Sequence, residues 1–300
     1  MVAKRELWVG CLCAAACEAI FGLSYLFTKD ATDAASPLAL LGWRFAVAFA
    51  ALGLLAAVRA VKVAPLRGRP VGPLVAVALA SPVCYFVGET YGIARTTASE
   101  SGAFLSAIPV ACLVASSLLL GKKPTRRQVA GIAVTLAGAL ATVLAASRAV
   151  SFSATGYAFL ALAVAAYSLY AVFVEKASAF NGAEIALAML GAGAAVFGTL
   201  ALAEAARGGG VRDLLRLPLE NRTFLRAVLF QGLGSSVLGF LLSNLAIAKI
   251  GVNRTASFIG VATAVAILSG VAFLGETFTI AQTVGVVLIV AGVYVANRRA

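Results

Sequence analysis

The chain has 300 residues, of which 62% are hydrophobic and only 12% are charged. Soluble domains carry about 25% charged residues, so the composition excludes a soluble globular protein. The net charge of +12 would indicate nucleic-acid binding in a soluble chain. In a membrane chain it indicates basic loops that set the orientation of helices and contact lipid head groups, so we expect no nucleic-acid partner.

Apolar stretches long enough to cross a bilayer recur along the whole chain. In chain order they are residues 8–28, 37–58, 71–92, 98–120, 127–146, 155–175, 182–204, 224–246, 252–274 and 279–296. They predict an all-α membrane protein with ten transmembrane helices, short loops and no soluble domain. The first stretch lacks a cleavage site after a short apolar core, so we expect it to be retained as a helix. Val211–Leu217 has the pattern of a short basic amphipathic helix on the membrane surface.

A weak internal repeat relates residues 120–131 to residues 274–285, 154 positions further on. Leu, Gly, Thr, Gln and Gly occur in the same register in both copies, and Ala137-Gly138 corresponds to Ala291-Gly292. The repeat predicts two five-helix halves of similar design, residues 1–148 and 149–300.

The matching Thr and Gln residues of the repeat have the pattern of a capping box at a helix start. They are Thr125 with Gln128 in the first copy and Thr279 with Gln282 in the second. We expect them to form helix-to-helix turns and not a binding site.

Five crossings in each half is an odd number, so the second half is expected to enter the membrane inverted. Inverted repeats are typical of transporters that bind substrate near the midplane, between the halves. Most basic loop residues fall on the side of the N-terminus, which predicts cytoplasmic N- and C-termini in the cell membrane. The loop between the seventh and eighth crossings is an exception, because it carries five arginines on the other side.

Other short motifs accompany the repeat. They are Phe21-Gly22-Leu23-Ser24, Ser36-Pro37-Leu38, Arg44-Phe45 and Leu274-Gly275-Glu276-x-x-Thr279-x-x-Gln282-x-x-Gly285. Together with the first-half copy, they resemble the EamA branch of the drug/metabolite transporter superfamily over essentially all 300 residues. The resemblance implies a ten-helix carrier that exports or exchanges amino acids, other small metabolites or drugs. The first half departs from the family's Gly-Glu pattern, because Lys122 stands after Gly121 where the pattern has a glutamate.

Ionisable residues at membrane depth are costly and are candidates for function. Glu18 shares a helical face with Gly22 and Tyr25. Its carboxyl group is interpreted either as a partner for a substrate ammonium or a proton, or as a structural partner of Arg44 on the next helix. Arg44 can alternatively hold a substrate carboxylate.

Polar side chains on other predicted helices complete the candidate substrate path, although such groups also join helices to one another. Glu89 follows Tyr85 by one helical turn, and Pro109 interrupts the backbone hydrogen bonds of the 98–120 helix. The full set is Glu18, Tyr25, Arg44, Tyr85, Glu89, Pro109, Tyr167, Tyr170, Gln231, Ser235 and Asn244.

The chain has no histidine, nucleotide-binding loop or nucleophile motif, so we expect no enzyme activity, cofactor or metal site. The leading interpretation is a secondary transporter that exports small metabolites, with amino acids as the first candidates. Its partners would be a small-molecule substrate and the lipid bilayer; the oligomeric state is not predicted. The alternatives are a proton-coupled exporter of organic cations that uses Glu18 and a membrane interaction protein without transport.

Overall fold

The computed structural model describes residues 4–93, 95, 104–146, 153–208, 210–274 and 280–297, which contain helices and no strand. In chain order the helices are α1 (Lys4–Ala34), α2 (Pro37–Ala57), α3 (Gly72–Ala78), η1 (Leu79–Cys84), α4 (Tyr85–Ile93), α6 (Ile108–Leu120), α7 (Arg126–Ala146), α8 (Ala154–Lys176), α9 (Gly182–Arg207), α10 (Val211–Glu220), α11 (Arg222–Leu229), η2 (Phe230–Gly239), α12 (Phe240–Ile250), α13 (Val252–Ala256), α14 (Ile259–Leu274) and α15 (Ile280–Asn297). The label η2 marks a π-helical segment that continues directly into its neighbours, and η1 marks the segment between α3 and α4 in which the helix is kinked at Ser81.

The all-helical membrane fold is confirmed. Within the described residues, seven continuous helical stretches are long and apolar enough to cross a membrane, and α6 is apolar but shorter. The predicted 98–120 helix is described only from residue 104, and the predicted 252–274 helix is divided into α13 and α14. The count of ten crossings therefore stays a prediction, as does the division at residue 148, which lies outside the described residues.

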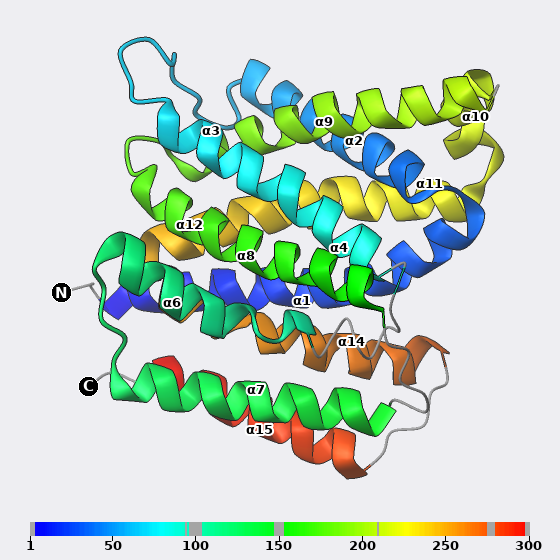
Figure 1. The fold of residues 1–300 in the computed structure, drawn as a ribbon. Coiled ribbons are helices and arrows are strands. Elements are labelled where there is room, and N and C mark those ends of the chain that lie inside the picture. Colours follow the sequence, from blue (N-terminus) through cyan, green and yellow to red (C-terminus); the bar gives the residue numbers. More distant parts are fainter. Residues whose placement is uncertain are drawn as a thin grey trace.

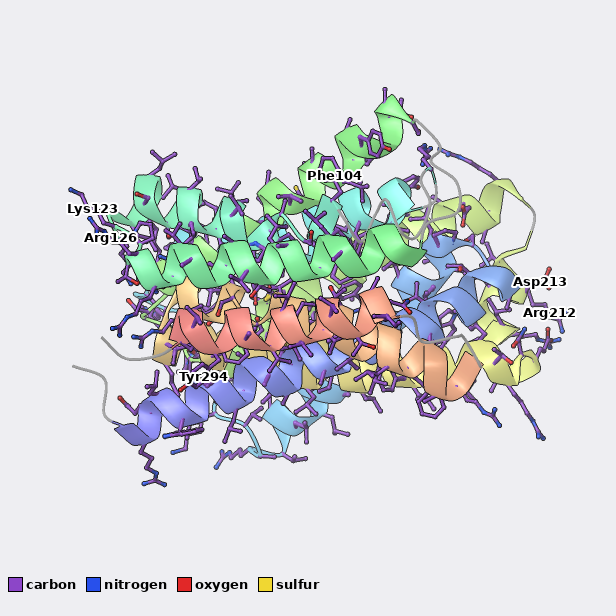
Figure 2. The ribbon with its side chains drawn as sticks, turned by 90° about the horizontal axis from the view of Figure 1, so that it is seen from below. Phe104, Lys123, Arg126, Arg212, Asp213 and Tyr294 are labelled. Atoms are coloured by element: carbon purple, nitrogen blue, oxygen red, sulfur yellow. The ribbon has the colours of Figure 1, made fainter. Side chains whose placement is uncertain are left out.

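The outer surface of the bundle is that of a membrane protein. Large apolar side chains such as Leu54 and Leu118 are 65% and 78% exposed, which a soluble monomer would not tolerate over so wide an area. Figure 2 shows Lys123 and Arg126 at one end of the bundle and Arg212 and Asp213 at the other. The apolar surface between these charged ends is suited to contact lipid chains.

Helices from the two halves of the chain pack against each other throughout the bundle. The pairs are α1 with α12 and α14, α2 with α9, α4 with α8, and α7 with α15. In Figure 1, α7 and α15 lie side by side along one edge, and both termini lie at the same end of the bundle. The repeat is thus built into the packing, because α2–α9 and α7–α15 join helices of equivalent position.

Glycines of the repeat allow this close packing. A Cβ atom added at Gly138 would lie 2.6 Å from the carbonyl oxygen of Gly285, and one at Gly292 would lie 2.4 Å from Thr135 Oγ1. Small residues let membrane helices approach until their backbones touch, and packing of this kind holds helices together inside a bilayer. The Ala-Gly match in the sequence is therefore a helix-contact feature.

The first-half turn is capped as its sequence predicts. The N–H of Thr125 donates to Gln128 Oε1 at 2.9 Å, and the N–H of Gln128 donates to Thr125 Oγ1 at 3.2 Å. Gly121 ends α6 with a φ of +64°, in the left-handed region that glycine adopts without strain. The second-half box includes Thr279, which lies outside the described residues.

The predicted amphipathic segment after α9 is confirmed as the helix α10. Trp43 Nε1 donates a hydrogen bond to the carbonyl oxygen of Leu214 at 2.9 Å, which ties α10 to α2. Leu215 and Leu219 are exposed. A position in the membrane surface suits these side chains and stays a prediction.

The α7–α15 contact generates a stability prediction. Gly131→Ala would place a Cβ atom 2.4 Å from the backbone nitrogen of Ala296, so one helix must move. Overpacking of this kind costs about 1–3 kcal/mol, and we expect a lower unfolding temperature in detergent. The control is Gly53→Ala in α2, whose Cβ would meet no described atom of a neighbouring element within 4 Å and which should be neutral or slightly stabilising. Equal unfolding temperatures for the two variants would contradict the predicted backbone contact.

Candidate functional site

Buried polar side chains gather between the halves of the chain. Glu18 and Arg44 are 4% and 6% exposed, and η2 contributes the buried side chains of Gln231, Ser235 and Ser236. Ionisable groups at membrane depth are costly, so their retention favours a function over simple packing.

Arg44 on α2 is held by one hydrogen bond and two aromatic rings. Its Nε donates to Ser236 Oγ at 2.7 Å, and its guanidinium carbon lies 4.5 Å from the centroid of the Phe86 ring and 5.5 Å from that of the Phe45 ring. Among the described residues the guanidinium forms no other hydrogen bond and no ion pair, so its two terminal amino groups are available to an anion. Arginine binds carboxylates in a bidentate manner through such groups.

Arg44 and Glu89 line the same cavity. The cavity has a volume of about 40 Å³, enough for a few water molecules. Its walls are Thr28, Thr32, Pro37, Leu40, Leu41, Arg44, Phe86, Glu89 and Thr90. A cation and an acid thus face one space, and Glu89 Oε1 accepts a hydrogen bond from the hydroxyl of Tyr85 at 2.7 Å.

Three tyrosines lead from this cavity toward the middle of the bundle. The ring centroids of Tyr85 and Tyr167 are 5.6 Å apart, and those of Tyr167 and Tyr170 are 5.5 Å apart. The hydroxyl of Tyr170 donates to Asn244 Oδ1 at 2.9 Å and lies 3.0 Å from Ser243 Oγ. α4, α8 and α12 therefore contribute one continuous row of aromatic and polar groups.

Glu18 lies beside this row. Its carboxyl group is close enough to Tyr167, Tyr170 and Cys112 to interact with them electrostatically. It forms no hydrogen bond or ion pair with any described residue, and Arg44 is not its partner. The structural pairing of Glu18 with Arg44 is therefore absent, because Arg44 lies with Ser236, Phe86 and the Glu89 cavity instead.

The third helix of each half is irregular at an equivalent place. η1 covers residues 79–84, and the residues 154 positions further on fall within η2. The helix is interrupted in η1 at Ser81, which has an extended backbone (φ −144°, ψ 123°). η2 is π-helical, and segments of this kind are frequent at functional sites. The two irregular segments precede the polar residues of α4 and α12 in the candidate site.

The polar groups of η2 are only partly satisfied. Gln231 Nε2 donates to the carbonyl oxygen of Ser24 at 3.0 Å and also contacts Thr28 Oγ1. Gln231 Oε1 and Ser235 Oγ are buried and have no hydrogen-bond partner among the residues that the structure describes. Buried groups of this kind are costly to leave unpaired, so each can accept a partner that a ligand or water supplies.

The structure brings together most of the predicted path residues, with two exceptions. Pro109 lies in the first turn of α6 and not within an unbroken 98–120 helix. With its repeat equivalent Thr263 it lines a separate cavity of about 10 Å³. The side chain of Tyr25 lies outside the described part of the structure. Phe86 was not predicted, because no sequence signal distinguishes this phenylalanine from those of the lipid-facing surface.

A helical bundle with ionisable side chains buried in its interior is typical of membrane transport proteins. The model of the EamA-like transporter family matches residues 8–144 and again residues 154–298. The chain therefore belongs to this family of transporters, in its two-repeat form.

Two individual proteins are similar to the chain. A Bacillus subtilis (strain 168) protein named "Uncharacterized transporter YcxC" is 29% identical over 280 residues, which are 93% of this chain and 89% of that protein. A solved crystal structure has a TM-score of 0.76 at 18% identity and covers 96% of this chain and 97% of its own. At this identity, the similarity to the solved structure shows the fold alone.

The hydrogen bonds of Tyr170 generate a prediction. Tyr170→Phe removes the hydroxyl and leaves Asn244 Oδ1 without this buried donor, which should cost about 1 kcal/mol. We expect a lower unfolding temperature in detergent. Tyr294→Phe is the matched control, because Tyr294 is 65% exposed. An equal change of unfolding temperature in both variants would show that the hydrogen bonds of the Tyr170 hydroxyl do not stabilise the fold.

Proposed function

We propose that the chain is a secondary transporter whose ten crossings form two inverted halves, residues 1–148 and 149–300, and that it exports small organic metabolites by alternating access. The pairing of equivalent helices and the irregular third helix in each half support this proposal. The distribution of basic loop residues supports a cell-membrane location with both termini in the cytoplasm.

Amino acids are the proposed substrates. The observation that carries this is the shared cavity of Arg44 and Glu89, where opposite charges face one space. An amino acid carries a carboxylate for the free amino groups of Arg44 and an ammonium for Glu89. Its side chain would extend toward the Tyr85–Tyr167–Tyr170 row.

Counterflow of radiolabelled amino acids into proteoliposomes tests the proposal. Arg44→Gln and Glu89→Gln should each lower the uptake rate of the transported amino acid at least about 10-fold, because each removes a charged contact in a desolvated site. Arg216→Gln on the exposed face of α10 is the matched loss of one positive charge and should leave uptake unchanged. If folded Arg44→Gln and Glu89→Gln proteins transport every tested amino acid normally, the proposal is wrong.

A proton-coupled exporter of organic cations is the second candidate. It is favoured by the buried carboxyl group of Glu18, which forms no hydrogen bond or ion pair within the described part of the chain. In that case efflux requires a pH gradient and Glu18→Gln abolishes it, whereas Arg44→Gln has no effect. Absence of any flux, together with a stably bound partner protein, would instead favour a membrane interaction protein.

A further inference from the structure

Three ion pairs form among the described residues, and all three join the first half of the chain to the second. They are Arg69–Glu184, Lys122–Glu175 and Glu6–Lys249. Each lies where helices begin or end on the side of the bundle that carries both termini, as Figure 1 shows for those helix ends. The two halves are therefore tied together by charge at this end.

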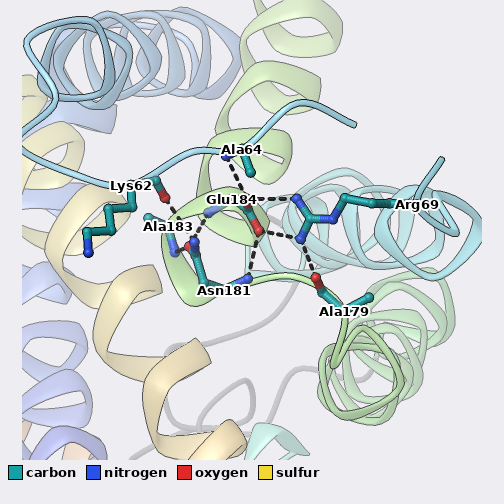
Figure 3. A network of polar contacts seen from close by, with 7 residues as sticks. All are labelled: Lys62, Ala64, Arg69, Ala179, Asn181, Ala183 and Glu184. Carbon is teal, nitrogen blue, oxygen red and sulfur yellow. Dashed lines mark hydrogen bonds and ion pairs between the residues drawn. The ribbon is translucent and has the colours of Figure 1, made fainter. Parts of the chain in front are cut away.

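The Arg69–Glu184 pair is a strap between the α2–α3 connection and the start of α9 (Figure 3). Glu184 accepts hydrogen bonds at 2.8 Å from both terminal nitrogens of Arg69, from the N–H of Ala64 and from the N–H of Asn181. The hydrogen bonds to the Glu184 carboxylate raise the pKa of Arg69 above its ordinary value. The side chain of Glu184 is only 3% exposed, and its carboxylate accepts hydrogen bonds from three different residues.

The helices on either side of this strap cannot separate easily. A Cβ atom on Gly42 of α2 would lie 2.9 Å from the Cβ of Ala201 on α9, and one on Gly193 of α9 would lie 2.5 Å from Phe45 of α2. α2 and α9 are thus in close contact at two places along their length, and this packing resists separation of the segments that the strap joins.

The Lys122–Glu175 pair is built differently, at a meeting of three connections. Glu175, near the end of α8, contacts Lys122 through Oε1. Its Oε2 accepts a hydrogen bond from the N–H of Val252 at 3.1 Å. Close by, Ser116 Oγ of α6 lies 2.5 Å from Asn253 Oδ1. The contact therefore joins the α6–α7 turn of the first half to α8 and α13 of the second.

This second contact is suited to break. The side chain of Lys122 is 53% exposed and that of Glu175 is 17% exposed, and exposed ion pairs are weak. Both turns that carry the contact contain a glycine with positive φ, Gly121 at +64° and Gly251 at +77°. Turns of this kind can absorb a change of backbone direction at little steric cost.

We propose that the Lys122–Glu175–Val252 contact is a latch, which holds the interior closed toward the end with the termini and breaks when the carrier opens there. The Arg69–Glu184 strap persists in both states. The latch rests on the proposed alternating access. Opening at this end must separate α6 from α13, and the contacts that cross between these two helices then break.

The buried thiol of Cys112 provides the test. Cys112 lies on α6, is 0% exposed and faces the interior near Glu18. In a protein that keeps Cys112 as its single cysteine, the rate of reaction with N-ethylmaleimide in lipid nanodiscs reports opening. Lys122→Gln and Glu175→Gln should each raise this rate about three- to tenfold. Lys123→Gln, which removes the neighbouring charge outside the latch, should leave the rate within about twofold.

A double variant sharpens the test. Lys122→Gln combined with Glu175→Gln should react no faster than Glu175→Gln alone, because both changes break one contact. Unchanged rates in both single variants, or an equal rise in Lys123→Gln, overturn the latch. Unfolding temperatures identify any variant whose Cys112 reacts because the protein has unfolded. If one single variant is unfolded, the labelling rate of the other one tests the latch.

Failure of the latch is separable from failure of the proposed function, since labelling needs no substrate. Faster labelling without flux of any metabolite retains the latch and rejects amino-acid transport. Amino-acid flux with unchanged labelling in the latch variants rejects the latch alone.

Discussion

Direct contact between helix backbones of the two halves is the interaction on which the rest of the structure depends. Lipid chains are as apolar as leucine, so the hydrophobic effect does not drive these helices together and van der Waals packing must do so. Gly131, Gly138 and Gly292 between α7 and α15, and Gly42 and Gly193 between α2 and α9, allow that packing. These contacts hold the halves together directly, and polar groups lie beside the apolar core between them.

The two buried ionisable groups in that space are stabilised to different degrees. Arg44 has Ser236 and the rings of Phe86 and Phe45, whereas Glu18 has no hydrogen-bond or ion-pair partner among the described residues. A charge without a partner is costly in an environment of low dielectric constant. The interior is therefore complementary to something that arrives from outside, and selection for stability alone would have replaced these side chains with apolar ones.

Much of this architecture could be predicted from the sequence, because helix positions follow from local apolar runs, capping residues and glycines. The first-half cap at Thr125 and the helix α10 were predicted in this way. The contacts of the site were not, because they depend on how separate helices are turned toward each other. A single sequence places Arg44 and Glu18 at membrane depth, but it cannot show that Arg44 faces η2 or that Pro109 begins a helix.

The π-helical segment η2 makes the site sensitive to chain length. Ser243 and Asn244 follow η2 along the same continuous helix, and their direction depends on how many residues separate them from α11. Removing or inserting one residue within η2 would turn everything after it by about 100°, which would carry Asn244 away from Tyr170. Side chains along this helix can therefore be exchanged without changing its direction, whereas an insertion or deletion in η2 would rearrange every polar group that follows it.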